Sequence, residues 1–550
     1  MKFLSAFFLG NALTNAADRF LPPWQYDGTV WPLPQSMAVT QEFQILDANI
    51  QFVLTPESPQ CDIIPDIFQR YQDLIRSHFK IASSSSKKLK FSASSAAGII
   101  DTIEVKIINC ENYPSQNMNE SYTLQVGSPT PEKVELTASA EWGVIHGLES
   151  FTQMIHNIDY RPSVNSTMIT DWPRFPFRGF LIDTSRHYLP ISVIKAQITA
   201  LSWNKMNILH WHIVDLQSFP YESQVLPELS FLGSYTPLHV YTIHEIKDII
   251  EFARLRGVRV VPEFDTPGHT DAWGPGGGPK FLTPCYRNGE PDGSHGPINP
   301  IYQENYDLMR KLFTEVNEVF RDSYLHLGGD EVPFGCWKSN PDITAYMAKN
   351  NLTTYAQLEQ VWVQGMVDIA HDLKKNYVVW EEVFVNGVKI SNETVVEVWK
   401  GRSGTWKDTM NAVTKSGHKA ILASPWYLNI ISYGVDWEGY YVIEPTDFNG
   451  TAEQNKLVMG GSAAMWGEFV DGTNILQRIW PRASAVAERL WSDKSVNQPG
   501  PARWRLNEWR CKMLARGLPA QPAIQNPNVN PNFGYCPYPF DPFNNAHYLF

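Results

Sequence analysis

The chain has 550 residues and a formal charge of −12, from 45 Lys and Arg against 57 Asp and Glu. Hydrophobic residues make up 43% of it and charged residues only 19%, which excludes a disordered chain rich in charge and poor in core-forming residues. The acidic balance also argues against a nucleic-acid partner, because phosphate binding needs clustered Lys and Arg. The length allows several typical domains, or one long barrel and a smaller domain.

Residues 1–16 have the pattern of a secretory signal peptide. Lys2 supplies a basic start, an apolar run extends from Phe3 to Leu13, and small residues follow up to Ala16. The run is too short for a membrane span, and no later stretch approaches the length of uninterrupted apolar sequence that a span requires. We therefore expect a protein of the secretory pathway without a membrane span.

Cysteines and glycosylation sequons agree with that compartment. The even number of cysteines is compatible with disulfides, several pairings are possible, and no CxxC pair indicates zinc. The cysteines are Cys61, Cys110, Cys285, Cys336, Cys511 and Cys536. N-x-S/T sequons predict N-glycosylation at Asn119, Asn165, Asn351, Asn392 and Asn449.

Residues 17–170 are predicted to form a small α+β domain. Residues 104–108 and 122–126 alternate between apolar and polar side chains as strands do. Residues 65–78 have the pattern of an amphipathic helix, and a second helix is expected to begin near residue 139.

Residues 171–550 show a different pattern, in which short apolar strands alternate with helical segments. The strands are predicted at residues 179–183, 207–214, 258–264, 324–328, 377–380, 395–399, 420–423 and 459–466. The helices are predicted near residues 191–202, 243–255, 302–320, 354–371 and 476–490. This repetition favours a (β/α)₈ TIM barrel with a C-terminal extension. A doubly wound open sheet is the alternative, but no GxGxxG follows an early strand.

Acidic and aromatic residues follow the predicted strands, at the end where a TIM barrel places its chemistry. The fourth strand closes on two glycines and then Asp330-Glu331. An Asp-Glu pair is often only a solvated turn, but an apolar strand followed by glycines favours a buried functional site. Trp and Glu recur at the later strand ends, which is typical of a sugar-binding face.

The His210-Trp-His212 pattern could instead belong to a metal site. Barrel metallohydrolases also need His or acid ligands on later strands, whereas strands five and six carry Trp and Glu. We therefore interpret both histidines as core residues and expect no metal. Arg186 and His187 are interpreted as bracing the barrel mouth.

Several motifs together resemble the β-N-acetylhexosaminidases of glycoside hydrolase family 20, most of all the animal lysosomal type. They lie at residues 178–190, 210–215, 263–269, 326–338, 425–427 and 465–468. The resemblance covers essentially the whole mature chain. It implies a small α/β domain on a TIM barrel, usually in a dimer. It also implies an exo-acting retaining enzyme that cleaves terminal β-linked N-acetylglucosamine and N-acetylgalactosamine, either lysosomal or secreted.

The resemblance further implies substrate-assisted catalysis. The substrate's own 2-acetamido oxygen attacks the anomeric carbon and forms an oxazolinium intermediate. Glu331 is then expected to be the general acid and base, Asp330 to accept the acetamido N–H, and Tyr427 to donate to the acetamido carbonyl. No cofactor is implied.

The remaining site residues are carried over from the same motifs. Trp380, Trp399 and Trp466 are expected to wall the sugar pocket. Arg178 and Glu468 are expected to hold sugar hydroxyls at its closed end, which would make the enzyme exo-acting. The resemblance also selects the disulfides Cys61–Cys110, Cys285–Cys336 and Cys511–Cys536.

His269, with Asp215, is expected to orient the acid pair from behind. The sequence departs from the family at Leu216, where the animal enzymes have a second Asp. It departs again at Asn429-Ile430, a substrate-binding position where related subunits have Asn-Arg or Asp-Leu. With neither the acid nor the arginine, we expect neutral substrates to dominate and sulfated sugars to be tolerated weakly.

A competing hypothesis is a catalytically silent sugar-binding protein on the same fold. Asp330, Glu331 and Tyr427 are all present, which argues against that hypothesis. An endo-acting enzyme of the chitinase type would need an open groove, and the expected roles of Arg178 and Glu468 disfavour it.

Overall fold

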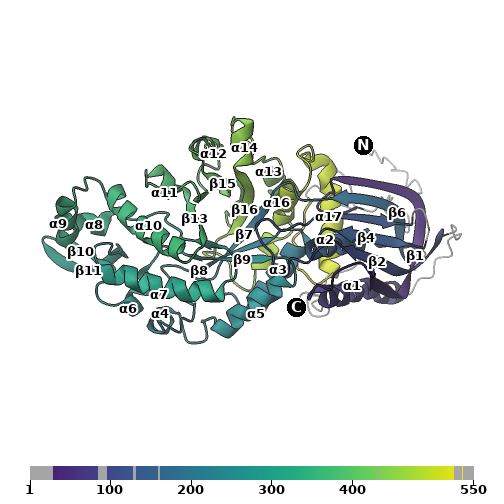
Figure 1. Cartoon of the computed structure of the whole chain (residues 1–550), viewed down its shortest axis with the longest axis horizontal. Coiled ribbons are helices and arrows are strands. Elements are labelled where there is room, and N and C mark those ends of the chain that lie inside the picture. The colour runs from purple at the N-terminus through teal and green to yellow at the C-terminus, as the bar shows by residue number, and fades with distance from the viewer. Residues whose placement is uncertain are drawn as a thin grey trace, which may run out of the picture.

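The computed structural model describes residues 29–84, 96–127, 132–158, 161–432, 434–524 and 536. The predicted signal peptide lies outside the described residues. Two units lie side by side along the longest axis (Figure 1). One unit is a sheet with its helices, and the other is a barrel with its surrounding helices.

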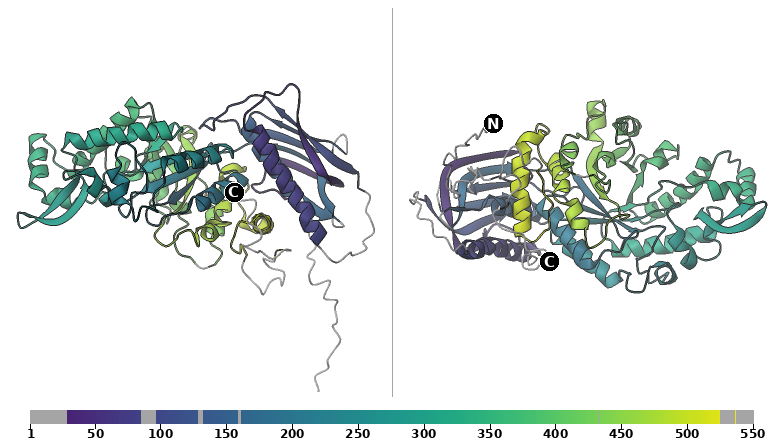
Figure 2. Two further views of the ribbon diagram at one scale, coloured as in Figure 1. Left: turned by 90° about the horizontal axis from the view of Figure 1, so that it is seen from below. Right: turned by 180° about the vertical axis from the view of Figure 1, so that it is seen from behind.

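The N-terminal unit is a mixed sheet of six strands in the order β1-β2-β4-β3-β6-β5, with β1 also paired to β6. Its strands are β1 (Ser36–Leu54), β2 (Gly98–Ile107), β3 (Tyr122–Val126), β4 (Val134–Ala138), β5 (His156–Ile158) and β6 (Arg161–Asp171). Helices α1 (Ile64–Ser84) and α2 (Glu141–Met154) pack on one face of this sheet (Figure 2). Strand β3 buries every second residue, as a strand with one covered face should.

The second unit is a closed barrel of eight strands, each parallel to its neighbours. The strands are β7 (Phe177–Asp183), β8 (Ile208–Val214), β9 (Arg259–Phe264), β12 (Tyr324–His326), β13 (Asn376–Trp380), β14 (Val395–Val398), β15 (Lys419–Leu422) and β16 (Val458–Met465). Each of the eight predicted strands is present. The TIM-barrel prediction is therefore confirmed, and the open-sheet alternative is wrong.

Helices surround the barrel, and short helices also lie within the segments that connect its strands. The longer ones are α3 (Ile191–Trp203), α5 (Ile243–Arg254), α7 (Gln303–Val319), α9 (Pro341–Lys349), α10 (Tyr355–Asp372), α12 (Trp406–Lys415), α16 (Arg482–Trp491) and α17 (Pro499–Ala515). The shorter ones are α4 (Glu228–Gly233), α6 (Gly274–Gly277), α8 (Gly335–Ser339), α11 (Glu381–Val385), α13 (Trp437–Tyr441), α14 (Ala452–Lys456) and α15 (Ile475–Ile479), with 3₁₀ turns η1 (Asp271–Trp273) and η2 (Ser424–Trp426). A hairpin of β10 (Leu282–Arg287) and β11 (Glu290–Ile298) extends from the barrel.

The predicted helix over residues 476–490 is two helices, α15 and α16, separated at Pro481. Proline has no N–H to donate and its ring disfavours a helical residue before it, so α15 ends and α16 begins there.

Buried charges join the two units. Lys205 of the barrel donates to Asp171 at 2.8 Å, and neither side chain is exposed. Arg516, just after α17, pairs with Glu149 of α2 at 2.6 Å. Removing one member of a buried pair leaves an uncompensated charge, so these contacts fix how the barrel meets the sheet.

All three predicted disulfides are present: Cys61–Cys110, Cys285–Cys336 and Cys511–Cys536. The middle one connects β10 to α8, close behind the loop that carries Asp330 and Glu331. Within the described part of the chain, no helix is long and apolar enough to cross a membrane.

The sequons differ in exposure. Asn119, Asn351, Asn392 and Asn449 are exposed. Asn165 lies within β6, is only 8% exposed, and donates its side-chain amide to the carbonyl of Thr40. Of the five sequons, Asn165 is therefore the least accessible in the folded chain, and glycosylation stays a prediction at all five.

Candidate active site

Four aromatic side chains meet at the C-terminal ends of neighbouring barrel strands. Trp380 ends β13, and Trp399, Tyr427 and Trp466 follow β14, β15 and β16. The rings of Trp399 and Tyr427 stack with centroids 5.8 Å apart, and Trp466 lies 6.4 Å from Tyr427 and 6.1 Å from Trp380. Burial raises the pKa of the Tyr427 hydroxyl well above its ordinary value, so this group remains a donor. We call these four residues the aromatic box.

Buried carboxylates hold two of these indoles in place. Trp380 Nε1 donates to Glu263 at 2.7 Å, and Trp399 Nε1 donates to Glu382 at 2.8 Å. A ring fixed by packing and by a hydrogen bond loses little freedom when a ligand binds, so the box is preorganised.

The acid pair follows a tight glycine turn after β12. Gly328 and Gly329 have φ values of 69° and 99°, and a Cβ on Gly328 would overlap the Asp265 carboxylate. Glu331 itself has φ 49°. The turn directs the two acids differently, because the Asp330 side chain is only 10% exposed whereas the Glu331 side chain is 57% exposed. One carboxylate is therefore held inside the barrel mouth and the other is open to a substrate.

Asp265 is a third carboxyl beside this pair, which the sequence analysis did not identify. It accepts the Gly329 N–H at 2.7 Å, and burial together with the neighbouring Asp330 raises its pKa well above the ordinary range. Burial and the charge of Asp330 therefore both favour the neutral form of Asp265. The sequence offers one indication that Asp265 belongs to the site: it directly follows β9, in the same motif as His269.

His269 and Asp215 lie where they were predicted, behind the acid pair. His269 Nδ1 is 3.0 Å from Asp215 Oδ1, and the other Asp215 oxygen is 2.7 Å from His212 Nε2. Burial alone would lower the pKa of His269, but the hydrogen bond with Asp215 and the charge of Asp330 raise it to about 9. His269 Nε2 lies 3.8 Å from Asp330 and 3.9 Å from Glu331, so an imidazolium faces both acids.

The prediction that Arg178 holds the sugar is wrong. Arg178 lies at the N-terminal end of β7, opposite the catalytic face, and is not exposed. Its guanidinium donates to the backbone carbonyls of Phe175 and Lys205, both at 2.8 Å, and pairs with Glu120 of the N-terminal unit. Arg178 therefore belongs to the junction between the two units.

Arg186, beyond the other end of β7, is the arginine of the site. It contacts Asp183 at 3.0 Å and Asp215 at 2.8 Å, and its guanidinium lies 5.0 Å from the Trp466 ring centroid. Burial opposes its charge, but Asp183, Asp215 and Glu468 raise its pKa above the usual value. Its position just after a strand end could have indicated that Arg186 belongs to the site. From the sequence, Arg186 was interpreted only as bracing the barrel mouth.

The remaining predicted residues lie at the edge of the aromatic box. Glu468 follows Trp466 and is exposed, and Ile430 packs against the box. The side-chain oxygen of Asn429 is buried and accepts no hydrogen bond from the described residues. Leu216 is 39% exposed, so the departure there places an apolar side chain near the mouth without removing Asp215.

Two groups of side chains have the composition of a metal site. They are His210, Glu263 and His326, and Asp265, His269 and Asp330, with ligand atoms within 4.8 Å of one another in each group. In the first group His210 Nε2 is 2.7 Å from Glu263, a hydrogen-bond distance, whereas two ligands of one tetrahedral zinc lie roughly 3.3 Å apart. In the second group burial and the charge of Asp330 raise the pKa of Asp265, which disfavours the carboxylate form that a metal binds. The first group therefore fits a hydrogen-bonded core better than a metal.

Comparisons with known proteins agree with this geometry. A family model described as "Glycosyl hydrolase family 20, catalytic domain" matches residues 175–494, and one described as "beta-acetyl hexosaminidase like" matches residues 30–154. The chain is 43% identical to beta-hexosaminidase subunit alpha of Mus musculus over 521 residues, 93% of this chain and 96% of that protein. It is 44% identical to beta-hexosaminidase subunit beta of Homo sapiens over 513 residues, 92% of this chain and 89% of that protein.

Among solved structures, the chitobiase of Flavobacterium johnsoniae superposes with a TM-score of 0.77 at 27% identity, covering 92% of this chain and 75% of that one. The N-acetyl-beta-hexosaminidase of Streptomyces plicatus, with a TM-score of 0.68 and 22% identity over 91% of this chain and 97% of that one, shares the fold.

Proposed function

This chain belongs to glycosyl hydrolase family 20, and from that premise we propose that it removes terminal β-linked N-acetylglucosamine and N-acetylgalactosamine from the non-reducing ends of glycans with retention of configuration. It is a glycoside hydrolase. The observation that best supports the proposed chemistry is the asymmetry of the acid pair, in which Asp330 is enclosed and Glu331 is open.

In the first step the substrate's acetamido oxygen bonds to the anomeric carbon while the glycosidic C–O bond breaks. Glu331 gives its proton to the leaving oxygen. In the second step Glu331 takes a proton from water, and the water oxygen bonds to the anomeric carbon as the oxazolinium C–O bond breaks. The breaking of that bond restores the acetamide. His269 stabilises the Glu331 carboxylate between the two steps by its charge.

Asp330 and Tyr427 hold the acetamido group in position for this attack. Asp330 Oδ1 is buried and accepts no hydrogen bond from the described residues, so it is available to the acetamido N–H. The positive charge that develops on that nitrogen strengthens the interaction in the transition state. Tyr427 donates its hydroxyl to the acetamido carbonyl, and the raised pKa of Asp265 disfavours a second negative charge beside Asp330.

We assign exo action to Arg186 and Glu468. Arg186 and Glu468 hold the sugar hydroxyls farthest from the scissile bond, and the aromatic box covers the apolar faces of the ring. Beside Asn429, Ile430 offers no charge to a sulfate, so neutral sugars are the preferred substrates.

We further propose a homodimer that is lysosomal or secreted. The two mammalian relatives carry the names of hexosaminidase subunits. Ile431 and Phe469, beside Asn429 and Glu468, are 74% and 73% exposed, as apolar residues of an interface are in an isolated chain. Light scattering of the purified protein distinguishes a dimer from a monomer, and organelle fractionation tests the location.

A substrate series tests the proposed function. The enzyme should cleave chromogenic β-N-acetylglucosaminide and β-N-acetylgalactosaminide, cleave the 6-sulfated glucosaminide weakly, and leave a β-glucoside without the acetamido group almost intact. Efficient cleavage of that β-glucoside would argue for a protein nucleophile. Binding of the sugars without any cleavage would support the silent sugar-binding alternative.

A further inference from the structure

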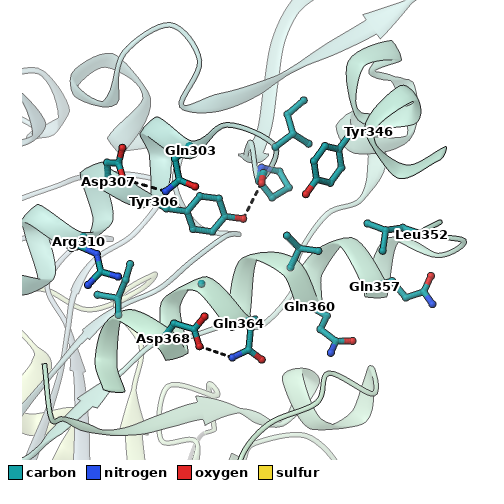
Figure 3. Close-up of a pocket in the computed structure, with 15 residues that line it drawn as sticks. Gln303, Tyr306, Asp307, Arg310, Tyr346, Leu352, Gln357, Gln360, Gln364 and Asp368 are labelled. Atoms are coloured by element: carbon teal, nitrogen blue, oxygen red, sulfur yellow. Dashed lines mark hydrogen bonds between the residues drawn. The ribbon is translucent and has the colours of Figure 1, made fainter. Parts of the chain in front are cut away.

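Away from the candidate active site, a groove with a volume of about 750 Å³ lies outside the barrel, between α7 and α10. Figure 3 shows side chains from the two helices meeting across it, with Tyr346 and Leu352 at one end. Tyr306 packs against Gly365, where any Cβ would overlap the tyrosine ring, and its hydroxyl donates to the carbonyl of Pro300 at 2.8 Å. The groove is therefore built around a fixed aromatic ring.

The lining of this groove suits a neutral carbohydrate. The rings of Tyr306 and Tyr346 line the groove and give it apolar surface for a sugar, although the Tyr306 ring also packs against Gly365 and Trp362. Planar amides and carboxylates, which donate to and accept from sugar hydroxyls, surround the rings. They are Gln303, Asp307, Gln357, Gln360, Gln364 and Asp368. Gln303 donates to Asp307 at 3.2 Å, Gln364 donates to Asp368 at 2.7 Å, and the Gln357 carbonyl accepts the Thr354 N–H, so these groups have only part of their hydrogen-bonding capacity left for a sugar (Figure 3). Arg310, the cation of the lining, is paired with Asp372 at 2.9 Å, so the groove offers little to a phosphate.

A sequon lies at the end of the groove. Asn351 is exposed, and the next residue, Leu352, lines the groove. From there the lining residues of α10 recur at helical spacing from Gln357 to Asp368, a run of about 17 Å at the ordinary helical rise. Several linked pyranose rings would cover this length.

We propose that an N-linked glycan on Asn351 lies along this groove, with its inner sugars against Tyr346 and Leu352 and its outer sugars against Tyr306 and Gln364. Because the glycan is attached at one end of the groove, its effective concentration there is in the millimolar range and weak sugar contacts suffice. The glycan then ties α9 and α10 together from outside. This proposal does not depend on the enzymatic activity of the chain.

The first test compares two exposed sequons in protein from a glycosylating host. Asn351 and Asn449 both have a positive φ, 54° and 58°, so replacing either one with Gln strains the backbone alike. Asn351→Gln and the control Asn449→Gln should each remove one glycan mass by intact-mass spectrometry. Asn351→Gln should lower Tm by about 1–2 °C more than Asn449→Gln does, a small shift because the folded unit is large. Both variants should keep wild-type kcat/KM. Absence of a glycan at Asn351, or equal Tm values for the two variants, would overturn the proposal.

A second test separates the glycan contact from the groove's own structure. Gln360→Ala combined with Gln364→Ala should lower Tm in the glycosylated protein and have a smaller effect in the Asn351→Gln background, as coupled sites do. Under native conditions an amidase should release the Asn351 glycan more slowly than the Asn392 glycan, and the double substitution should remove that protection. Equal effects in both backgrounds, or equal release rates in the wild type, would overturn the proposal.

Discussion

The Nε2 atom of His269 lies 3.9 Å from Oε2 of Glu331, too far for a direct hydrogen bond and close enough for a strong charge interaction. Asp215 holds the other ring nitrogen at 3.0 Å. The imidazolium therefore keeps a fixed position while Glu331 changes from acid to carboxylate and back. The predictions below follow from this arrangement.

The charge of His269 should make stability depend on pH. Because its folded pKa is raised, its contribution is fully present below its unfolded pKa of about 6.5 and is lost as pH rises through about 9. His212 behaves similarly: burial opposes its charge, but Glu263 and Asp215 raise its pKa to about 10. Thermal denaturation from pH 5 to 10 should show Tm falling above pH 7. The fall should be smaller in His269→Gln, and an identical fall in that variant would contradict the assignment.

Replacing Asp265 with Asn should be less damaging than replacing it with Ala. An Asn at this position can accept the Gly329 N–H and donate to Asp330, as a protonated Asp does. Asp265→Ala leaves a buried N–H unpaired and should cost about 1–3 kcal/mol of unfolding free energy, with at least a tenfold loss in kcat. Steady-state kinetics and denaturant unfolding of both variants check this prediction. If Asn were as damaging as Ala, Asp265 would act as a charged group.

The two arginines should differ in their effect on kcat/KM. Arg186→Lys should lower kcat/KM by roughly tenfold to a hundredfold, as the loss of charged hydrogen bonds to a sugar worth about 1.5–3 kcal/mol does. It should also lower Tm, because the ion pairs of Arg186 with Asp183 and Asp215 are buried. Arg178→Lys should lower Tm because it disturbs a buried junction, while the folded fraction keeps its KM. The reverse pattern would restore Arg178 as the sugar-binding arginine.

Ile430 should control the response to sulfated sugars. It packs against the aromatic box and carries no charge. Ile430→Arg should raise the rate on 6-sulfated glucosaminide relative to the neutral glucosaminide, and Ile430→Leu serves as the control. An unchanged ratio of the two rates in the arginine variant would remove this residue from substrate selection.

The barrel could be predicted from the sequence because every strand is apolar and is followed by polar residues. Strands β1 and β6 were missed because neither buries alternate residues along its length: the first part of β1 has no buried residue, and most of β6 is buried on both faces. Arg178 was assigned to sugar binding because of its motif. The motif does not show that Arg178 lies at the N-terminal end of β7, away from the catalytic face. The role of Asp265 could not be predicted, since it depends on a neighbouring carboxyl that only the fold brings close.

The most direct test of the account is the rate of Glu331→Gln with substrates that differ only in their leaving group. The variant keeps the aromatic box, Asp330 and Tyr427 but cannot give a proton to the leaving oxygen. With a basic leaving group such as a second sugar, kcat should fall by about 10²–10⁴. With an activated aryl leaving group, which departs without a proton, the first step should be much less affected. Equal losses for the two substrates, or near-wild-type turnover of the disaccharide, would contradict the assignment of Glu331 as the general acid.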